Sequence, residues 1–184
     1  MKQDRQVALL RGINVGRAKR VAMADLRVLV EGLGYRNVRT LLNSGNVVFT
    51  SPAAAASGAA SRIEKSLANQ LGISSRVAVL TAVELAGIVA DNPLLEVAHD
   101  PSRLLVAVLH DRADRTLLEP LLKQDWAPDI LALGERVAYL WCNEGLLASR
   151  LADTVGRVLR DGVTTRNWAT ILKLHALTSA PGTD

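Results

Sequence analysis

The chain has 184 residues, of which 49% are hydrophobic and 22% charged, and its formal net charge is +4. This composition is typical of a globular protein with a sizeable core, and it excludes a disordered chain; no run approaches the ~18 apolar residues of a membrane span. The single cysteine, Cys142, excludes an intrachain disulfide and argues against a thiolate-rich metal site. Because the charged first six residues are not followed by an apolar run long enough for a secretory signal, we expect a cytoplasmic protein.

The first half of the chain predicts a β-α-β-β-α-β succession. Continuous apolar runs indicate buried strands, and apolar residues three and four positions apart indicate amphipathic helices. In chain order, the expected elements are a strand at 7–10, a helix at 22–33, strands at 38–42 and 47–49, a helix at 61–71 and a strand at 76–80.

The second half repeats this order loosely. Its expected elements are a helix at 81–91, a strand at 103–110, a short helix at 116–123, strands at 129–133 and 136–141, and helices at 147–159 and 165–177. This order predicts an α+β protein built from two split β-α-β units with mainly antiparallel sheets and C-terminal helices. We expect an N-terminal subdomain at 1–80 and a C-terminal one at 81–184.

Two polar loops follow two of the strands in the first half. A right-handed crossover should place the strands at 7–10 and 38–42 parallel and adjacent in one sheet. Residues 11–16 leave the end of the first strand, and residues 43–46 leave the end of the second. We therefore expect both loops at one end of the sheet.

The side chains of these loops suit an anionic or amide-rich ligand. Arginine offers a forked cation, asparagine offers both a donor and an acceptor, and glycine lets the backbone approach a ligand closely. The glycine spacing matches neither a Rossmann nor a P-loop fingerprint. Alternatively, the polar residues satisfy only the turns, and Arg11 pairs with Asp25. The candidate ligand-binding residues in these loops are Arg11, Asn14, Lys19, Asn43, Ser44 and Asn46.

A third polar group lies at residues 164–167. Thr165 is a natural N-cap for the last helix, which would place Arg166 and Asn167 in its first turn. Helix N-termini attract anions, whereas a cation there opposes the helix dipole. Arg166 and Asn167 are therefore two further candidate ligand-binding residues, with a plain ion pair of Arg166 as the alternative.

The charge distribution and the missing residue types favour binding over catalysis. Residues 1–50 carry nine basic and three acidic side chains, a balance of +6, whereas residues 51–149 have a balance of −4. A phosphate-bearing partner would fit the basic part. The polar loops hold no Asp, Glu or His to act as a general base, the three histidines show no metal spacing, and no cofactor is predicted.

Several short motifs recur in one known group of proteins. They are LLRGINVG at 9–16, MADL at 23–26, Arg39-Thr40, SGNVVF at 44–49, Asn92-Pro93 and TTRNW at 164–168. Through these motifs the chain resembles the domain-of-unknown-function-1697 family of bacterial proteins over nearly its whole length, although Arg17 and Leu41 stand where that family usually has a glycine and an aromatic residue. The resemblance implies a two-part α+β fold of ferredoxin-like units and implies no activity. It marks as motif members Arg11, Asn14, Ser44, Asn46, Arg166 and Asn167.

The leading hypothesis is a binding protein for a nucleotide or another phosphorylated or anionic ligand, held by the loops at 11–16 and 43–46. Three alternatives remain open. The first is an enzyme of unknown reaction that uses Ser44 or Arg11, the second is a structural or self-association module, and the third is an RNA-binding protein. Residues Tyr139 and Trp141 are the one pair with the spacing of an RNA-stacking platform, and core packing is the more ordinary use for them. No membrane partner is predicted, and the oligomeric state does not follow from the sequence.

Overall fold

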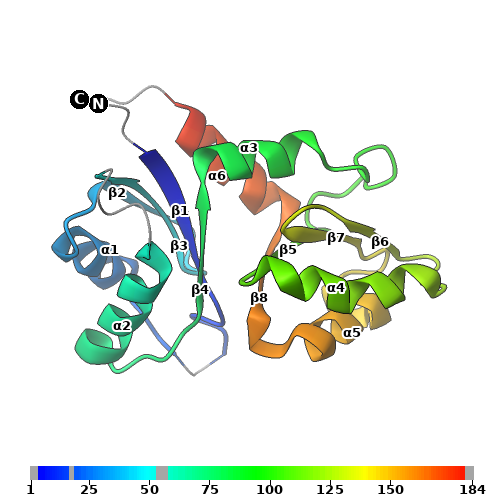
Figure 1. Ribbon diagram of the computed structural model, residues 1–184, viewed down its shortest axis with the longest axis horizontal. Helices are drawn as coiled ribbons and strands as arrows, with labels where there is room; N and C mark the ends of the chain where they lie inside the picture. Colours follow the sequence, from blue (N-terminus) through cyan, green and yellow to red (C-terminus); the bar gives the residue numbers. More distant parts are fainter. Residues whose placement is uncertain (1–3, 17–18, 53–57, 181–184) are drawn as a thin grey trace. The chain divides into compact units, whose positions relative to one another are not determined.

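The computed structural model describes residues 4–16, 19–52 and 58–180. The chain divides into two compact units, which Figure 1 shows coloured along the sequence. The N-terminal unit comprises Met1–Leu85 with Leu174–Asp184, and the C-terminal unit comprises Ala86–Lys173. The division into folding domains at 1–80 and 81–184 stays a prediction.

The N-terminal unit has the expected β-α-β-β-α-β order. Its elements are β1 (Asp4–Leu10), α1 (Met23–Gly32), β2 (Arg36–Leu41), β3 (Asn46–Ser51), α2 (Ala59–Leu71) and β4 (Val77–Thr81). They form a four-stranded sheet in the order β2-β3-β1-β4, in which every neighbouring pair is antiparallel. This is the arrangement of a ferredoxin-like unit, so the predicted fold class is confirmed here.

One detail of the predicted sheet is wrong. Strands β1 and β2 run in the same direction, but they are not neighbours, because β3 lies between them and pairs with both. The crossover rule fixes the relative direction of two strands and leaves room for a third strand to insert. The C-terminal ends of β1 and β2 therefore still lie at the same end of the sheet.

The core of the N-terminal unit lies between the sheet and the two helices. Alternate residues of β1, among them Ala8 and Leu10, point to this side, where Leu26 of α1 and Ile63 of α2 are fully buried with them. Phe49 of β3 completes this layer, and Figure 1 shows α1 and α2 on the same side of the sheet. The two-residue period of the strand and the helical stripes meet as the apolar pattern predicts.

The C-terminal unit repeats the topology. Its elements, with the helices that enter and leave it, are α3 (Ala82–Ala90), β5 (Leu104–Leu109), α4 (Arg115–Leu118), β6 (Ile130–Leu133), β7 (Val137–Trp141), α5 (Arg150–Leu159), β8 (Val163–Asn167) and α6 (Trp168–Ser179), with 3-10 helices η2 (Arg112–Asp114), η3 (Glu119–Lys123), η4 (Leu146–Ala148) and η5 (Arg160–Gly162). The sheet order β6-β7-β5-β8 is again fully antiparallel. Leu105, Ala107 and Leu109 of β5 pack against α4 and α5.

The predicted start of the last helix is also wrong. Residues 163–167 form the strand β8, and α6 begins at Trp168. The Oδ1 atom of Asn167 accepts a hydrogen bond from the Thr170 amide at 2.9 Å, so Asn167 caps the helix in place of Thr165. Arg166 therefore lies in a strand, where it pairs with Val106, and the argument from the helix dipole does not apply to it.

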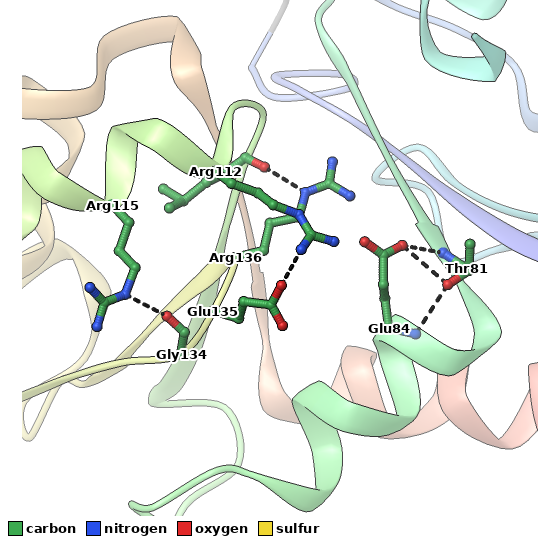
Figure 2. Close-up of polar contacts among 8 residues, drawn as sticks. Thr81, Glu84, Arg112, Arg115, Gly134, Glu135 and Arg136 are labelled. Carbon is green, nitrogen blue, oxygen red and sulfur yellow. Dashed lines mark hydrogen bonds and ion pairs between the residues drawn. The ribbon is translucent and has the colours of Figure 1, made fainter. Parts of the chain in front are cut away.

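Side-chain hydrogen bonds satisfy backbone groups at the ends of two helices. Thr81 and Glu84 form a reciprocal capping box at the start of α3: the Thr81 amide donates to the Glu84 carboxylate at 2.8 Å, and the Glu84 amide donates to the Thr81 hydroxyl at 3.1 Å (Figure 2). At the end of the last helix, the Arg5 guanidinium donates to the carbonyls of Thr178 and Ala180, at the C-terminus of α6.

No helix in the described part of the chain has the length and apolar character needed to cross a membrane.

Candidate functional site

The candidate site is one end of the N-terminal sheet, which we call the N-terminal rim. It consists of residues 11–16 and 19–22 after β1, residues 42–46 at the turn from β2 into β3, and residues 72–76 before β4. The Leu10 amide donates to the Gly45 carbonyl at 2.9 Å, and the Arg11 amide donates to the Arg76 carbonyl at 2.9 Å. The two loops selected from the sequence therefore meet, and a third joins them.

Asn14 holds the first loop in place. Its Oδ1 atom accepts from the Val21 amide at 2.9 Å, and its Nδ2 atom donates to the Val21 carbonyl at 2.9 Å, which closes the loop on itself. The same amide donates to the Asn43 carbonyl at 2.8 Å. One half-buried side chain thus ties residues 14–21 to the β2–β3 turn.

Asn46 and Ser44 organise the second loop. The fully buried Asn46 amide donates to the Leu41 carbonyl at 2.9 Å and to the Ser44 hydroxyl at 3.0 Å. Between them, Gly45 has φ +78°, and a Cβ atom added there would lie 2.8 Å from Cβ of Leu10. The turn therefore needs glycine at this position for both its backbone angle and its closeness to β1.

The third loop was missed by the sequence reasoning, although strand direction could have found it. Because β4 is antiparallel to β1, the residues before β4 must lie where β1 ends. The Ser75 hydroxyl donates to the Arg11 carbonyl at 2.9 Å. Glu64 of α2 also reaches this end: its carboxylate accepts from the Val77 amide at 2.8 Å and lies 3.4 Å from the Arg76 guanidinium.

The backbone of the first loop has an unusual pattern. Gly12, Asn14, Gly16 and Lys19 have φ of +65°, +55°, +61° and +51°, whereas Ile13 between the first two does not have a positive φ. The backbone at these positions is therefore left-handed, and the Asn14 N–H group donates within the loop to the Lys19 carbonyl at 3.1 Å. Lys19 is exposed at the end of this segment, and residues 17–18, including Arg17, lie outside the described residues.

The rim contains six of the eight predicted residues. The other two, Arg166 and Asn167, belong to the C-terminal unit. Burial of the Arg166 guanidinium lowers its pKa to about 10, which leaves it charged at neutral pH, and its Nη1 atom donates to the Thr165 carbonyl at 2.9 Å. Asn167 is occupied as the cap of α6.

The C-terminal unit has an equivalent end of its sheet, which we call the C-terminal rim (residues 110–112, 134–136 and 160–162). The backbone contacts correspond: the Leu109 amide donates to the Arg136 carbonyl at 3.0 Å, and the His110 amide donates to the Gly162 carbonyl at 2.9 Å. Leu109 thus takes the position of Leu10, and Arg136 takes that of Gly45. The two rims can therefore be compared residue by residue.

The chemistry of the two rims differs. In the C-terminal rim the Arg112 guanidinium pairs with Glu135, and the Arg136 guanidinium donates to the Leu109 carbonyl at 3.1 Å (Figure 2). Arg115 of α4 donates to the Gly134 carbonyl at 2.9 Å. By contrast, the described loops of the N-terminal rim contain three arginines and one lysine but no aspartate or glutamate. Glu64, which comes from α2, is the carboxylate that the structure shows beside them.

Comparison with known proteins gives the family. Residues 3–139 match the family described as "Protein of unknown function (DUF1697)". The chain belongs to this family. A solved structure described as that of the conserved bacterial protein SP0830 from Streptococcus pneumoniae shares the fold with a TM-score of 0.80 and 21% sequence identity, over 96% of this chain and 99% of that one. None of the curated proteins matches the chain.

The family and the shared fold name no reaction. Within the described residues no three His, Cys, Asp or Glu side chains lie close enough together to hold a metal ion. The geometry of the two rims is therefore the feature of this DUF1697 protein that bears on its function.

Proposed function

We propose that this DUF1697 protein binds a nucleotide or another phosphorylated small molecule at the N-terminal rim. The observation that carries the proposal is the contrast between the rims. The same backbone frame holds loops with intrinsic counter-charges in the C-terminal unit, and described loops with four basic residues and no acidic ones in the N-terminal unit. A ligand that supplies negative charge is complementary to the second arrangement.

The residues divide into two roles. Arg11 and Lys19 supply the charges for the ligand, and the backbone N–H groups of Gly12 and Gly16, where the chain is left-handed, supply hydrogen bonds. Asn14, Asn43 and the Ser44–Asn46 turn hold the loops in position through the contacts described above, and the Ser44 hydroxyl lies at their meeting point. This division follows from the amide groups of Asn14 and Asn46 being committed to the loops themselves.

The test is a ligand titration of the full chain followed by thermal shift and by ¹H–¹⁵N spectra. The probes are ATP, glucose 6-phosphate and inorganic phosphate. Arg11→Ala leaves the backbone bonds of residue 11 intact and should weaken binding by tenfold or more, as expected for the loss of a charge-assisted contact of about 1.5–3 kcal/mol. Arg27→Ala, which removes an exposed arginine paired with Glu31 on α1, is the matched control and should bind normally.

Two results would overturn the proposal. One is that none of the three probes stabilises the protein or moves its amide signals. The other is that Arg11→Ala and Arg27→Ala weaken binding equally, since that would show only a nonspecific effect of net charge. Arg166→Gln tests separately whether Arg166 takes part, and the proposal for the N-terminal rim does not depend on its result.

A further inference from the structure

A small recess in the C-terminal unit combines unpaired charges of both signs with an aromatic wall. Its volume is about 170 Å³, and its walls include Trp126, Pro128, Asp129, Glu144 and Arg150. These residues come from the segment before β6 and from the η4–α5 region. The recess is unrelated to the rims and to the phosphorylated ligand proposed for the N-terminal one.

The cationic wall is preorganised. The Arg150 guanidinium lies over the Trp126 ring, 5.1 Å from its centroid, and its Nη2 atom donates to the Asp125 carbonyl at 2.8 Å. The Trp126 indole is itself fixed, because its Nε1 atom donates to the Leu121 carbonyl at 2.7 Å. Trp126 is thus a positioning residue for the Arg150 charge.

Another part of the lining is anionic. The Asp129 carboxylate is held rigidly, with one oxygen accepting from the Asn143 amide at 2.9 Å and the other from the Ser149 hydroxyl at 2.6 Å. Both donors are neutral, so the negative charge of Asp129 is not cancelled. Exposed Glu144 lines the same recess.

The opposite charges face one recess without forming an ion pair. Among the residues that the structure describes, Arg150 has no salt bridge to an acidic side chain, and neither Asp129 nor Glu144 has one to a basic side chain. Four other arginines of the same unit do pair with an acidic side chain, namely Arg103, Arg112, Arg115 and Arg157. The Arg150 guanidinium therefore lies beyond ion-pair distance from the carboxylates of Asp129 and Glu144.

We propose that this recess binds a small zwitterion, a free α-amino acid, with its carboxylate on Arg150 and its ammonium group on Glu144 and Asp129. A molecule that carries both charges can bridge the gap that the side chains leave open, and the fork of Arg150 suits a carboxylate. The volume equals that of roughly five or six liquid waters, which is enough for glycine, alanine or proline. Pro128 and Trp126 supply the apolar wall for the side chain of the ligand.

The test is a titration of the full ¹⁵N-labelled chain with glycine, alanine and proline, and in parallel with acetate and methylamine as single-charge halves. The zwitterions should shift the amide signals of residues 126–129 and 143–150 with millimolar affinity, at least tenfold tighter than either half. Arg150→Gln and Glu144→Gln should each weaken binding at least tenfold. Arg157→Gln, on the same helix and paired with Asp153, is the control and should bind normally.

Three results would overturn the inference. They are no response to any amino acid at 100 mM, equal responses to acetate and the amino acids, or unchanged binding in Glu144→Gln. Arg150→Lys guards against a folding defect in Arg150→Gln, because it keeps the positive charge and removes the forked guanidinium. If Arg150→Lys binds amino acids more weakly than the unsubstituted chain but more tightly than Arg150→Gln, the result supports the proposal. If Arg150→Lys binds them as tightly as the unsubstituted chain, the result contradicts the proposed contact between the guanidinium and the carboxylate.

Discussion

The two units share one topology, and they differ in what their sheets carry at the same end. Each unit orders its four strands as second-third-first-fourth, and in each a backbone hydrogen bond from the last residue of the first strand to the hairpin turn extends the antiparallel ladder to the rim. In the N-terminal unit, the first strand is followed by twelve residues before α1 begins at Met23, whereas in the C-terminal unit only His110 and Asp111 separate β5 from η2. One frame thus supports an elaborated basic rim and a short, internally paired one.

The difference extends to single positions. Buried Asn46 of β3 lies opposite Leu9, the second-last residue of β1, and buried Val137 of β7 lies opposite Val108, the second-last residue of β5. Asn46 and Val137 therefore occupy equivalent positions in the two sheets. The N-terminal unit thus keeps a buried amide where the C-terminal unit needs only an apolar side chain. A buried polar group of this kind must be hydrogen-bonded, and Asn46 satisfies that requirement by fixing the turn.

The largest effect is expected at Gly45, the point where the N-terminal turn touches β1. Gly45→Ala should lower the free energy of unfolding by about 2–4 kcal/mol, because the new Cβ would lie 2.8 Å from Leu10 and the residue would keep a positive φ. Gly12→Ala is the matched control: it has φ +65° and nothing within 4 Å, so only about 1 kcal/mol should be lost. Urea denaturation measures both, and equal losses would refute the close-approach argument.

The next effect tests the Asn46–Val137 difference directly. Asn46→Val places the residue of the C-terminal unit in the N-terminal turn and should cost about 1–3 kcal/mol, because the Leu41 carbonyl and the Ser44 hydroxyl lose their donor. It should also weaken any ligand at the N-terminal rim. A variant with unchanged urea stability would show that the amide is dispensable to the turn.

A smaller effect concerns Tyr139, which stands in β7 where β3 has Val48. Burial, reinforced by Asp91, raises the pKa of Tyr139 to about 12, and the hydroxyl donates to the Ile88 carbonyl at 2.8 Å. A folded-state pKa above the unfolded value of 10 gives stability that is complete below pH 10 and is lost as the pH rises toward 12. Between pH 9 and 11 the loss should be about 1 kcal/mol by urea denaturation. Tyr139→Phe should reduce this pH dependence, and an unchanged slope would contradict the assignment.

The smallest effect is expected at the ion pair of the C-terminal rim. Arg112→Ala should change the free energy of unfolding by less than about 0.5 kcal/mol, because both side chains of the Arg112–Glu135 pair are more than half exposed. Differential scanning calorimetry at low and high salt checks this. A loss well above about 1 kcal/mol would contradict this, because it would show that the Arg112–Glu135 pair contributes strongly to the stability of the C-terminal rim.

The sequence predicted the fold class and the meeting of two loops because both follow from general rules. Strand direction after a crossover placed residues 11–16 and 43–46 at one end of a sheet, and the contact between Asn14 and Asn43 confirms it. The insertion of β3 between β1 and β2 was not predictable in the same way, because handedness fixes direction and not adjacency.

Other features depend on contacts between residues distant in the sequence. Residues 163–167 lack the apolar alternation of a strand, and Thr165 is as good a cap by type as Asn167, so the start of α6 was placed too early. Ser75 and Glu64 reach the N-terminal rim from residues more than 50 positions after Arg11, and no local pattern marks them.

Selective binding at the N-terminal rim is best tested by titrating the ¹⁵N-labelled chain with ATP and following the backbone amide signals of both rims at once. We expect the signals of residues 12–16 and 43–46 to move with a saturable dependence on ATP concentration, while those of residues 110–112 and 134–136 stay fixed. Equal movement at both rims, or movement at neither, would contradict it.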